Sequence, residues 1–565
     1  MKRKRGVVMR GFWKKAVVIA CVLALAAGCG QSDKNETVGT EHQNESVVQG
    51  SKVFEGATVI ELSDEEITVD GSVISDKEDS AVYAAKDIVF YLENQGIAYG
   101  EGEKADEHSQ AEADAHTVVH ITKPGTYAVS GTLSAGQIAI DLGKDAKEDP
   151  DAVVNLILNG VDIKCSVAPA VIFYNVYECG SSDVEEAVKD VDTEAAGANV
   201  LLADGSVNNV EGAYVARIYK PDSVELSEDG TEVLDAKKLH KYDAAFYSKM
   251  SMNINGDENG TGVLNITASN EGLDSELHLT INGGNINIVS GNDGINTNED
   301  EVSVTTVNGG TLKIHVSGIT GEGDGIDSNG WLVINGGTVI TEACSKSADA
   351  GIDSDLGIHI NGGTVIATGN MLDHISESMQ NYAVFQFASS QKAGETYILK
   401  NEAGEAVFTY KPENDFTYLI VSSEELVAGT YTLWQGETQL AASAGSMMGG
   451  FGGQRPEGME LPEGMQFPGD GQMPDFGSSE EGEMPEGMYR PEKGEMPDMQ
   501  LPEGITPPEE IGRPVEGDET AGFGGGRPGN GNGFNGMQGN AALSTEIVIA
   551  DGGNYFSNVS IAKEK

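Results

Sequence analysis

Residues 323–338 read GDGIDSNGWLVINGGT, and this stretch decides the fold because it recurs. Related stretches are EGLDSELHLTINGGNI (271–286), DGINTNEDEVSVTTVNGGTL (293–312) and AGIDSDLGIHINGGTV (350–365). The asparagine of each Asn-Gly-Gly stands at position 282, 308, 335 or 361, so the intervals are 26, 27 and 26 residues. Each unit has a Gly-rich corner, an alternating strand, a Gly-Gly turn and a second alternating strand.

This period identifies the architecture. It is too short for a pair of helices, and it lacks the leucine pattern of leucine-rich repeats. Short strands of period two with one circuit per repeat predict an all-β fold, a right-handed parallel β-helix. In such a stack the apolar residues of successive circuits point inward and form columns, here including Leu279, Ile281, Leu332, Ile334, Ile358 and Ile360.

The repeats define the domain organisation. Weaker copies at 125–142, 153–165, 198–210 and 245–269 extend the β-helix to residues 54–384, with polar stretches near 100–116 and 216–243 expected as surface loops. Alternating strands in 385–445, together with 541–565, predict a small antiparallel β module. Residues 446–540 hold 12 of the 17 prolines and repeat the motif Pro-Glu-Gly. This composition predicts a long disordered loop inside the module.

The first 28 residues have the pattern of an export signal. A basic start and a short apolar run end in Leu25-Ala26-Ala27-Gly28-Cys29, which is similar to a bacterial lipobox. We therefore expect a lipoprotein signal peptide over 1–28, lipidation at Cys29 and a flexible linker over 29–53. An ordinary signal peptide or a membrane anchor is the alternative. We expect the protein to be extracytoplasmic and to contact the bacterial cell membrane only through its lipid anchor.

Charge limits the partners. Beyond Gly28 the chain has 90 acidic and 28 basic side chains, an excess of 62 negative charges. Such a surface repels nucleic acid, so no nucleic-acid partner is expected, but it suits divalent cations. Three cysteines remain after residue 29, and this odd number does not form a disulfide framework. Cys165 and Cys179 could pair, or all three could be free thiols together with Cys344.

The Gly-rich corners carry the candidate metal ligands. Stacked circuits lie about 4.8 Å apart, so equivalent side chains become neighbours. One column is predicted to contain Asp274, Asn296, Asp327 and Asp353, and a second contains Glu271, Asp293, Asp324 and Ala350. Neighbouring carboxylates repel one another unless a cation lies between them, and calcium accepts six to eight oxygen ligands. We expect calcium as a cofactor, with six ligand positions: Asp274, Asp293, Asn296, Asp324, Asp327 and Asp353. The alternative is that these residues only cap turns.

Trp331 is the candidate sugar contact. It alternates with the inward-facing Leu332 and therefore points outward beside the Asp327 corner. An exposed indole next to polar groups can serve as a platform for a sugar ring. Packing under a loop or against the C-terminal module is the alternative.

The tandem GDGIDS…INGGTV circuits, preceded by TYAVSGTLSAGQI and LNGVDI, resemble bacterial carbohydrate-binding domain-containing proteins with a parallel β-helix. The resemblance covers roughly 54–384. It implies a fold similar to that of calcium-dependent pectate lyases and a polysaccharide partner, cellulose or an acidic sugar polymer, as for clostridial members. This chain departs from the pattern at Asn296 and Ala350, where acids are usual, and in the insertions of the upstream circuits.

These observations predict a surface-anchored, non-catalytic polysaccharide-binding protein with calcium-stabilised corners. The first alternative is a calcium-dependent pectate-lyase-like enzyme, in which Lys313 would be the base. The second is a structural surface protein or adhesin. No catalytic residue is assigned.

Overall fold

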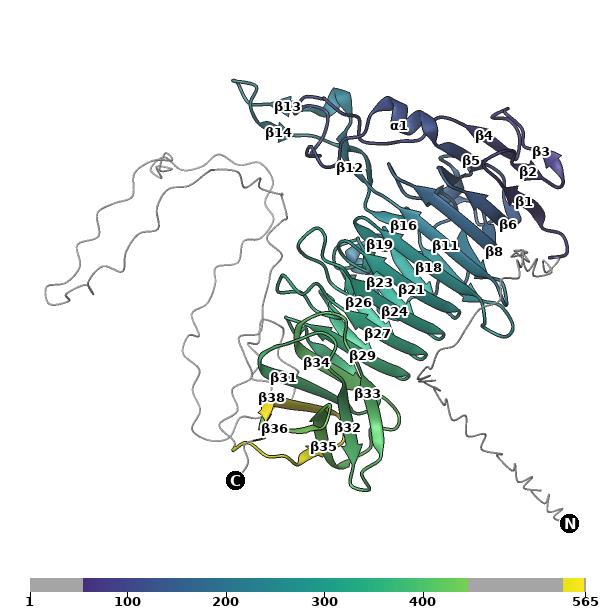
Figure 1. Cartoon of the computed structure of the whole chain (residues 1–565). Coiled ribbons are helices and arrows are strands. Elements are labelled where there is room, and N and C mark those ends of the chain that lie inside the picture. Colours follow the sequence, from purple (N-terminus) through teal and green to yellow (C-terminus); the bar gives the residue numbers. More distant parts are fainter. Residues whose placement is uncertain (1–53, 446–541, 563–565) are drawn as a thin grey trace, which may run out of the picture. The chain divides into compact units, whose positions relative to one another are not determined.

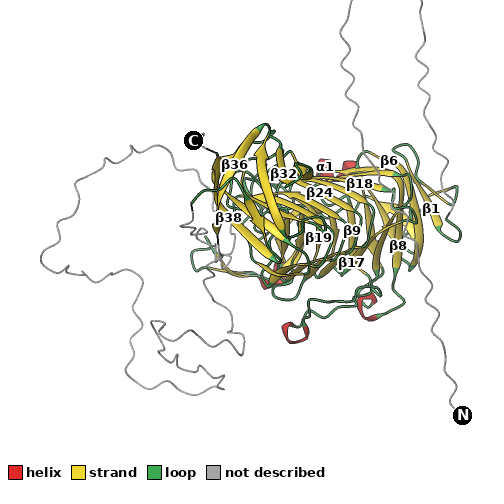
Figure 2. Ribbon diagram, turned by 90° about the horizontal axis from the view of Figure 1, so that it is seen from below, coloured by secondary structure: helices red, strands yellow, loops and turns green. Residues whose placement is uncertain are grey.

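The computed structural model describes residues 54–445 and 542–562, which form an all-β protein (Figures 1 and 2). In these ranges there is one α-helix, α1(Gln110–Ala115), and three short 3₁₀ turns, Ala146–Glu148, Val184–Glu186 and Pro221–Ser223. No helix in the described part of the chain is long and apolar enough to cross a membrane. The predicted signal peptide, the lipidation site Cys29, the linker 29–53 and the disordered loop 446–540 lie outside the described residues.

Three parallel ladders organise the central strands. Ladder 1 runs through β8(Val154–Cys165), β10(Ala198–Leu202), β17(Met252–Gly256), β20(His278–Ile281), β23(Val304–Val307), β26(Trp331–Ile334), β28(Gly357–Ile360) and β30(Ile375–Ser378). Ladder 2 runs through the end of β8, then β11(Val207–Gly212), β18(Val263–Ala268), β21(Asn285–Ser290), β24(Thr311–Val316), β27(Thr338–Glu342) and β29(Thr364–Gly369). Ladder 3 runs through β5(Thr117–Ile121), β7(Gly136–Asp141), β9(Val171–Asn175), β16(Ala244–Ser248), β19(Glu271–Ser275), β22(Ile295–Thr297) and β25(Ile326–Ser328).

The regular circuits contribute one strand to each ladder and bury their apolar residues against the circuits on either side. β8 serves both ladder 1 and ladder 2, and among the described residues the last circuits, with β28 to β30, have no strand in ladder 3. Leu279 pairs with Met252, and Leu332 pairs with Ile358. The six apolar residues predicted to point inward are all buried. A single circuit cannot enclose an apolar core, so the stability of the stack comes from burial between circuits.

The Asn-Gly-Gly turn connects ladder 1 to ladder 2 in the regular circuits. Gly337 has a φ of +80°, a conformation that favours glycine. A Cβ atom on Gly336 would lie 2.6 Å from the carbonyl oxygen of Asn308 in the preceding circuit. A Cβ on Gly337 would lie 2.7 Å from the carbonyl oxygen of Gly310, so both glycines permit close stacking, and the second also permits the turn.

The C-terminal strands cover one end of the stack (Figure 1). They are β31(Tyr382–Gln391), β32(Tyr397–Asn401), β33(Ala406–Tyr410), β34(Phe416–Ser422), β35(Gly429–Gln435), β36(Thr438–Gly445), β37(Ile547–Ile549) and β38(Gly553–Ile561). Most of the pairings among them are antiparallel, but β31 and β38 are parallel. β34 pairs antiparallel with β29, the last strand of ladder 2. The strands after residue 541, β37 and β38, therefore pair with strands that precede residue 446.

Two hydrophobic cores meet at β31. Its Val384 packs in the core of the stack, whereas its neighbours Ala383 and Phe385 pack in the core of the C-terminal module. The predicted boundary at 384/385 therefore falls inside a strand that serves both cores.

The N-terminal region and the polar stretches have more regular structure than surface loops. The N-terminal region contributes strands β1(Thr58–Leu62), β2(Thr68–Val69), β3(Ser72–Val73), β4(Val82–Ala85) and β6(Gly125–Leu133). β1 pairs parallel with β6. The first polar stretch contains α1, which Ser109 and Glu112 begin with a capping box. The second contains β12(Val215–Tyr219), β13(Glu225–Leu226), β14(Val233–Asp235) and β15(Lys238–Tyr242), paired as two antiparallel ribbons.

The cysteines form no disulfide bond in the described residues. Cys165 and Cys344 are buried free thiols, and Cys179 is a half-buried one.

Candidate functional site

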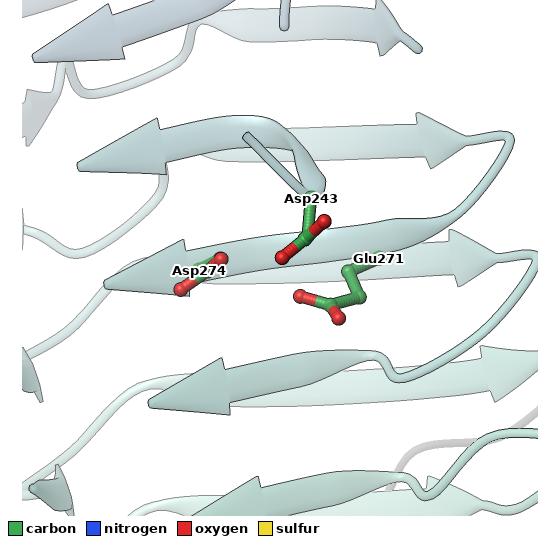
Figure 3. A group of neighbouring side chains, drawn as sticks. All are labelled: Asp243, Glu271 and Asp274. Carbon is green, nitrogen blue, oxygen red and sulfur yellow. The ribbon is translucent and has the colours of Figure 1, made fainter. Parts of the chain in front are cut away.

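Three carboxylates converge on ladder 3. Asp243, Glu271 and Asp274 each offer an oxygen within 4.8 Å of the others (Figure 3). Their exposed fractions are 8%, 6% and 0%. Within the ranges that the structure describes, this is the one group of three metal-ligating side chains so close together.

The stacking of circuits produces this cluster. Glu271 and Asp274 lie on β19, and Asp243 immediately precedes β16, the neighbouring strand. Ala244 pairs with Glu271, and Tyr247 pairs with Asp274. Because the strands are parallel and in register, an acid at the start of one circuit lies beside the acids of the next.

The three carboxylates differ in their partners. Both oxygens of Asp274 accept hydrogen bonds from Nδ2 of Asn298, at 2.9 and 3.0 Å. Asp243 forms an ion pair with Lys241 at 2.6 Å. Oε1 of Glu271 accepts a long hydrogen bond of 3.4 Å from Asn296, and its Oε2 has no partner among the described residues. Oδ1 of Asn296 is also buried and has no hydrogen-bond partner among the described residues.

Burial raises the pKa of every acid in the cluster, and repulsion by neighbouring carboxylates adds to the increase. For Glu271 the causes are desolvation, then the charges of Asp243 and Asp274. For Asp274 they are desolvation, then the charges of Asp243 and Glu276. Desolvation raises the pKa of Asp243 although Lys241 opposes the change. A cation among these oxygens would remove the repulsion.

Lys241 is unsuited to act as a general base. Desolvation alone would lower the pKa of its ammonium group, but the attraction of Asp243 raises it above its ordinary value. A catalytic lysine base needs a pKa near neutrality.

The register of the paired strands aligns the residues of the first predicted column from circuit to circuit. Asn296 pairs with Asp274 on one side and with Asp327 on the other. The backbone amide of Asp353 donates to the carbonyl of Ile326 in the preceding circuit. Desolvation and the charge of Asp353 raise the pKa of Asp327 to about 7, and desolvation and the charge of Asp373 raise that of Asp353 to about 8.

The second predicted column is held by side-chain-to-backbone hydrogen bonds. Oδ1 of Asp293 accepts from the backbone amide of Asp324 at 2.6 Å, and Oδ1 of Asp324 accepts from that of Ala350 at 2.5 Å. Desolvation and the charge of Asp327 raise the pKa of Asp293, and desolvation and the charge of Asp293 raise that of Asp324. These acids cap the corners through their Oδ1 atoms.

Of the six predicted ligand positions, Asp274 belongs to the compact three-acid cluster. Asp293, Asn296, Asp324, Asp327 and Asp353 continue along the stack, where they stay predictions as ligands. The residue that our prediction lacked altogether is Asp243. Aligning FYSKMSMNING (246–256) with LDSELHLTING (273–283) would have placed Tyr247 at the Asp274 position and Asp243 beside Glu271.

A surface cavity adjoins the cluster. It has a volume of about 350 Å³, and its wall includes Asp243, Lys241, Glu276, Glu299 and Asp300. Asp243 thus belongs to both the cluster and this cavity. The lining has four acids against two lysines, Lys238 and Lys241, so its excess of negative charge would attract cations.

Trp331 and Lys313 occupy other parts of the stack. Trp331 begins β26, pairs with Val304 and Gly357, and is half-buried. Lys313 is exposed on β24 of ladder 2, where it pairs with Asn287 and Ile340. The acid columns lie on ladder 3, so Lys313 and the columns belong to different sheets.

A second, larger cavity lies along ladder 1, with a volume of about 580 Å³. One wall is a row of asparagines from the turns, and the other is the segment 189–194. The row is hydrogen-bonded from circuit to circuit: Asn282 donates to Asn255 at 2.9 Å, Asn308 to Asn282 at 2.8 Å, and Asn335 to Asn308 at 2.8 Å.

Comparison with known proteins identifies the class. The family model of carbohydrate-binding domain-containing proteins matches residues 115–403, which include the parallel ladders from β5 onward. The chain therefore belongs to the carbohydrate-binding domain-containing protein family.

Two individual proteins are similar to the chain. A carbohydrate-binding domain-containing protein of Acetivibrio thermocellus is 29% identical over 170 residues, 30% of this chain and 44% of that protein. The chain thus matches less than half the length of this relative. A gadolinium derivative of a polysaccharide lyase-like protein from C. thermocellum is 20% identical, covers 54% of this chain and 92% of its own, and has a TM-score of 0.29.

Proposed function

We propose that this protein is a non-catalytic polysaccharide-binding protein whose ligand binds to the stack of circuits. The observation that carries this proposal is the family match, because it spans 115–403 and so falls on the stack. The stack repeats the same polar groups at each circuit. A surface of this kind suits a polymer, which also repeats its groups.

We propose calcium as the cofactor of the three-acid cluster. The supporting observation is Oε2 of Glu271, a buried oxygen without a partner among the described residues. Asp243 and Asp274 supply further carboxylate oxygens, and Asn296 supplies an unpartnered amide oxygen nearby. This all-oxygen donor set suits calcium, whereas zinc prefers nitrogen and sulfur ligands. The bound ion would neutralise repulsion between the carboxylates.

We also propose that the stack is a right-handed parallel β-helix, which is the usual hand of connections between parallel strands. The three in-register parallel ladders support this architecture. The lipobox-like sequence ending at Cys29 supports attachment to the outer face of the bacterial membrane by a lipid. Replacing Cys29 by serine should release the protein from the membrane fraction of expressing cells.

Affinity electrophoresis tests polysaccharide binding directly. The intact chain is run through gels containing hydroxyethyl cellulose or polygalacturonate, with calcium or with EDTA. Retardation by at least one polysaccharide relative to a gel without polysaccharide is expected, and free migration in every gel would contradict the proposal. The same protein is incubated with polygalacturonate and calcium, and the ultraviolet absorbance of unsaturated product is followed. A steady increase in absorbance would show that the protein is a lyase and would contradict the proposal that it is non-catalytic.

A further inference from the structure

The cavity along ladder 1 has the chemistry of a binding site for a neutral glycan. We propose that a neutral polysaccharide chain lies in this cavity, along the row of asparagines and parallel to the stack axis. This proposal rests on the proposed function and adds the place, direction and charge class of the ligand.

The asparagines leave one donor and one acceptor per circuit for a ligand. An asparagine amide has two N–H donors and two acceptor lone pairs. Within the row, Asn282 and Asn308 each use one donor toward the preceding circuit and one lone pair toward the next. Both side chains are exposed, and they have no further hydrogen-bond partner among the described residues. Sugar hydroxyls donate and accept, so they match this arrangement.

The period of the row suits a polymer. Successive circuits are about 4.8 Å apart, so the same pair of free groups recurs at that interval. The row from Asn255 to Asn335 spans three circuit steps, about 14 Å. A single sugar would use one step of this array, whereas an extended chain running along the stack would use all of them.

The floor and the opposite wall are held in place before a ligand arrives. Oγ1 of Thr193 lies 2.7 Å from Oδ1 of Asn253 and 2.7 Å from Oγ1 of Thr280, and Nδ2 of Asn253 donates to the carbonyl of Thr193 at 2.7 Å. These contacts attach the segment 189–194 to strands β17 and β20. A preformed wall reduces the entropy cost of binding.

The charge of the wall selects against acidic sugars. The cavity is lined by Asp190, Asp192 and Glu194, with Lys189 as the one cation in its lining, and Lys189 pairs with Asp190 at 2.8 Å. Asp192 and Glu194 are exposed, and no ion pair is formed by either within the described residues. Their charges would repel a uronic-acid polymer, whereas carboxylates accept hydrogen bonds from neutral sugar hydroxyls.

Calorimetric titration of the intact chain tests the site. The probes are cellobiose, cellotetraose and cellohexaose, and the variant is Asn308→Ala. The matched control is Asn265→Ala, because Asn265 donates to Asn209 and accepts from Asn287, both at 2.9 Å, in another row on ladder 2. Affinity should rise with probe length. Asn308→Ala should weaken cellohexaose binding about tenfold, because each sugar hydrogen bond lost lowers affinity several-fold, and Asn265→Ala should leave it unchanged.

The outcomes separate this inference from the proposed function. Equal affinity for cellohexaose in the wild type, Asn308→Ala and Asn265→Ala would place the glycan elsewhere and leave polysaccharide binding intact. Absence of binding to any polysaccharide in affinity electrophoresis would overturn both. A double variant, Asp192→Asn with Glu194→Gln, should gain retardation in polygalacturonate gels and keep its binding to cellohexaose. Unchanged migration in those gels would refute the charge selection.

Discussion

At the scale of single residues, Glu271 is the feature of the site that most needs a ligand. Its side chain is buried, two other carboxylates lie beside it, and its Oε2 has no hydrogen-bond partner in the described chain. An ionised, unpaired oxygen in this position costs several kcal/mol, which is why burial raises the pKa of Glu271 in the metal-free protein. A calcium ion would convert that cost into binding energy.

Replacing Glu271 by glutamine should therefore have opposite effects on stability and on metal binding. We expect the EDTA-treated variant to gain about 1–3 kcal/mol in free energy of unfolding, because one buried like charge is removed. Its calcium affinity should fall tenfold or more, because a charged ligand is lost. Denaturant titration and calorimetry measure the two effects. Glu258→Gln, at an exposed turn, is the control. Calcium affinity equal to that of the wild type would exclude Glu271 as a ligand.

The raised pKa of Asp327 predicts how the stability of the metal-free protein depends on pH. Its pKa is about 7 in the folded protein and near 3.9 when unfolded. Between these values the folded state holds a proton that the unfolded state has lost, so stability falls as the pH rises from about 4 through 7. In EDTA, Asp327→Asn should therefore stabilise by about 2–4 kcal/mol at pH 8 and by only about 1 kcal/mol at pH 5.

Denaturant titrations at both pH values measure this difference, with the exposed Asp551→Asn as the control. A stabilisation of equal size at pH 5 and pH 8 would show that Asp327 does not titrate in this range.

At the scale of elements, the Asn-Gly-Gly turn sets the spacing of the circuits. Its sequence signal was strong because each position has a physical requirement: a hydrogen-bonding amide at the first, no Cβ at the second, and at the third both no Cβ and a left-handed conformation. The registers of Asp274, Asn296 and Asp327 follow from the shared corner motif, Gly-apolar-Asp/Asn-Ser/Thr, and were predictable. Asp243 was not predicted because its circuit lacks the Gly-apolar-Asp corner, although the 27-residue interval from Asn255 to Asn282 places it beside Glu271.

Two glycine variants separate stacking from turn conformation. Gly337 and Gly404 have φ angles of +80° and +81°, but a Cβ would meet the carbonyl oxygen of Gly310 at 2.7 Å in the first case and nothing within 4 Å in the second. Gly404→Ala should cost about 1 kcal/mol, the strain of the left-handed conformation. Gly337→Ala should cost about 3 kcal/mol, because a clash between circuits is added. Equal losses in denaturant titrations would show that close stacking is unimportant at this turn.

The wall of the glycan cavity could not be predicted from the sequence. Thr193 is 60 residues from Asn253 and 87 residues from Thr280, yet it contacts both. No repeat relates the segment 189–194 to the circuits, so its position depends on tertiary contacts alone. Trp331, which the sequence favoured as the sugar contact, is half-buried on β26 and is not part of the described lining of this cavity. Its role in sugar binding stays a prediction.

At the scale of the whole molecule, β31 and β34 join two cores. Val384 and Ile420 belong to the core of the stack, whereas Phe385 and Leu419 belong to that of the C-terminal module. A repeat stack exposes apolar surface at its last circuit unless another element covers it. The module therefore completes the stack, a relation that the alternating pattern of 385–445 did not reveal.

This shared strand predicts one cooperative unfolding transition. Val384→Ala should cost about 2 kcal/mol and Phe385→Ala about 3–5 kcal/mol, and each should lower the midpoint of the same transition. Calorimetry and far-ultraviolet circular dichroism measure it. Two separate transitions, of which each variant shifts only one, would show that the cores unfold independently.

The most direct test of the central claim is a glycan-array screen of the intact chain, performed in calcium and again after EDTA treatment. We predict signals on neutral polysaccharides in calcium, with weaker signals once chelation has destabilised the acidic corners. A chain that is folded in calcium and gives no signal on any glycan would contradict the claim that this stack binds polysaccharide.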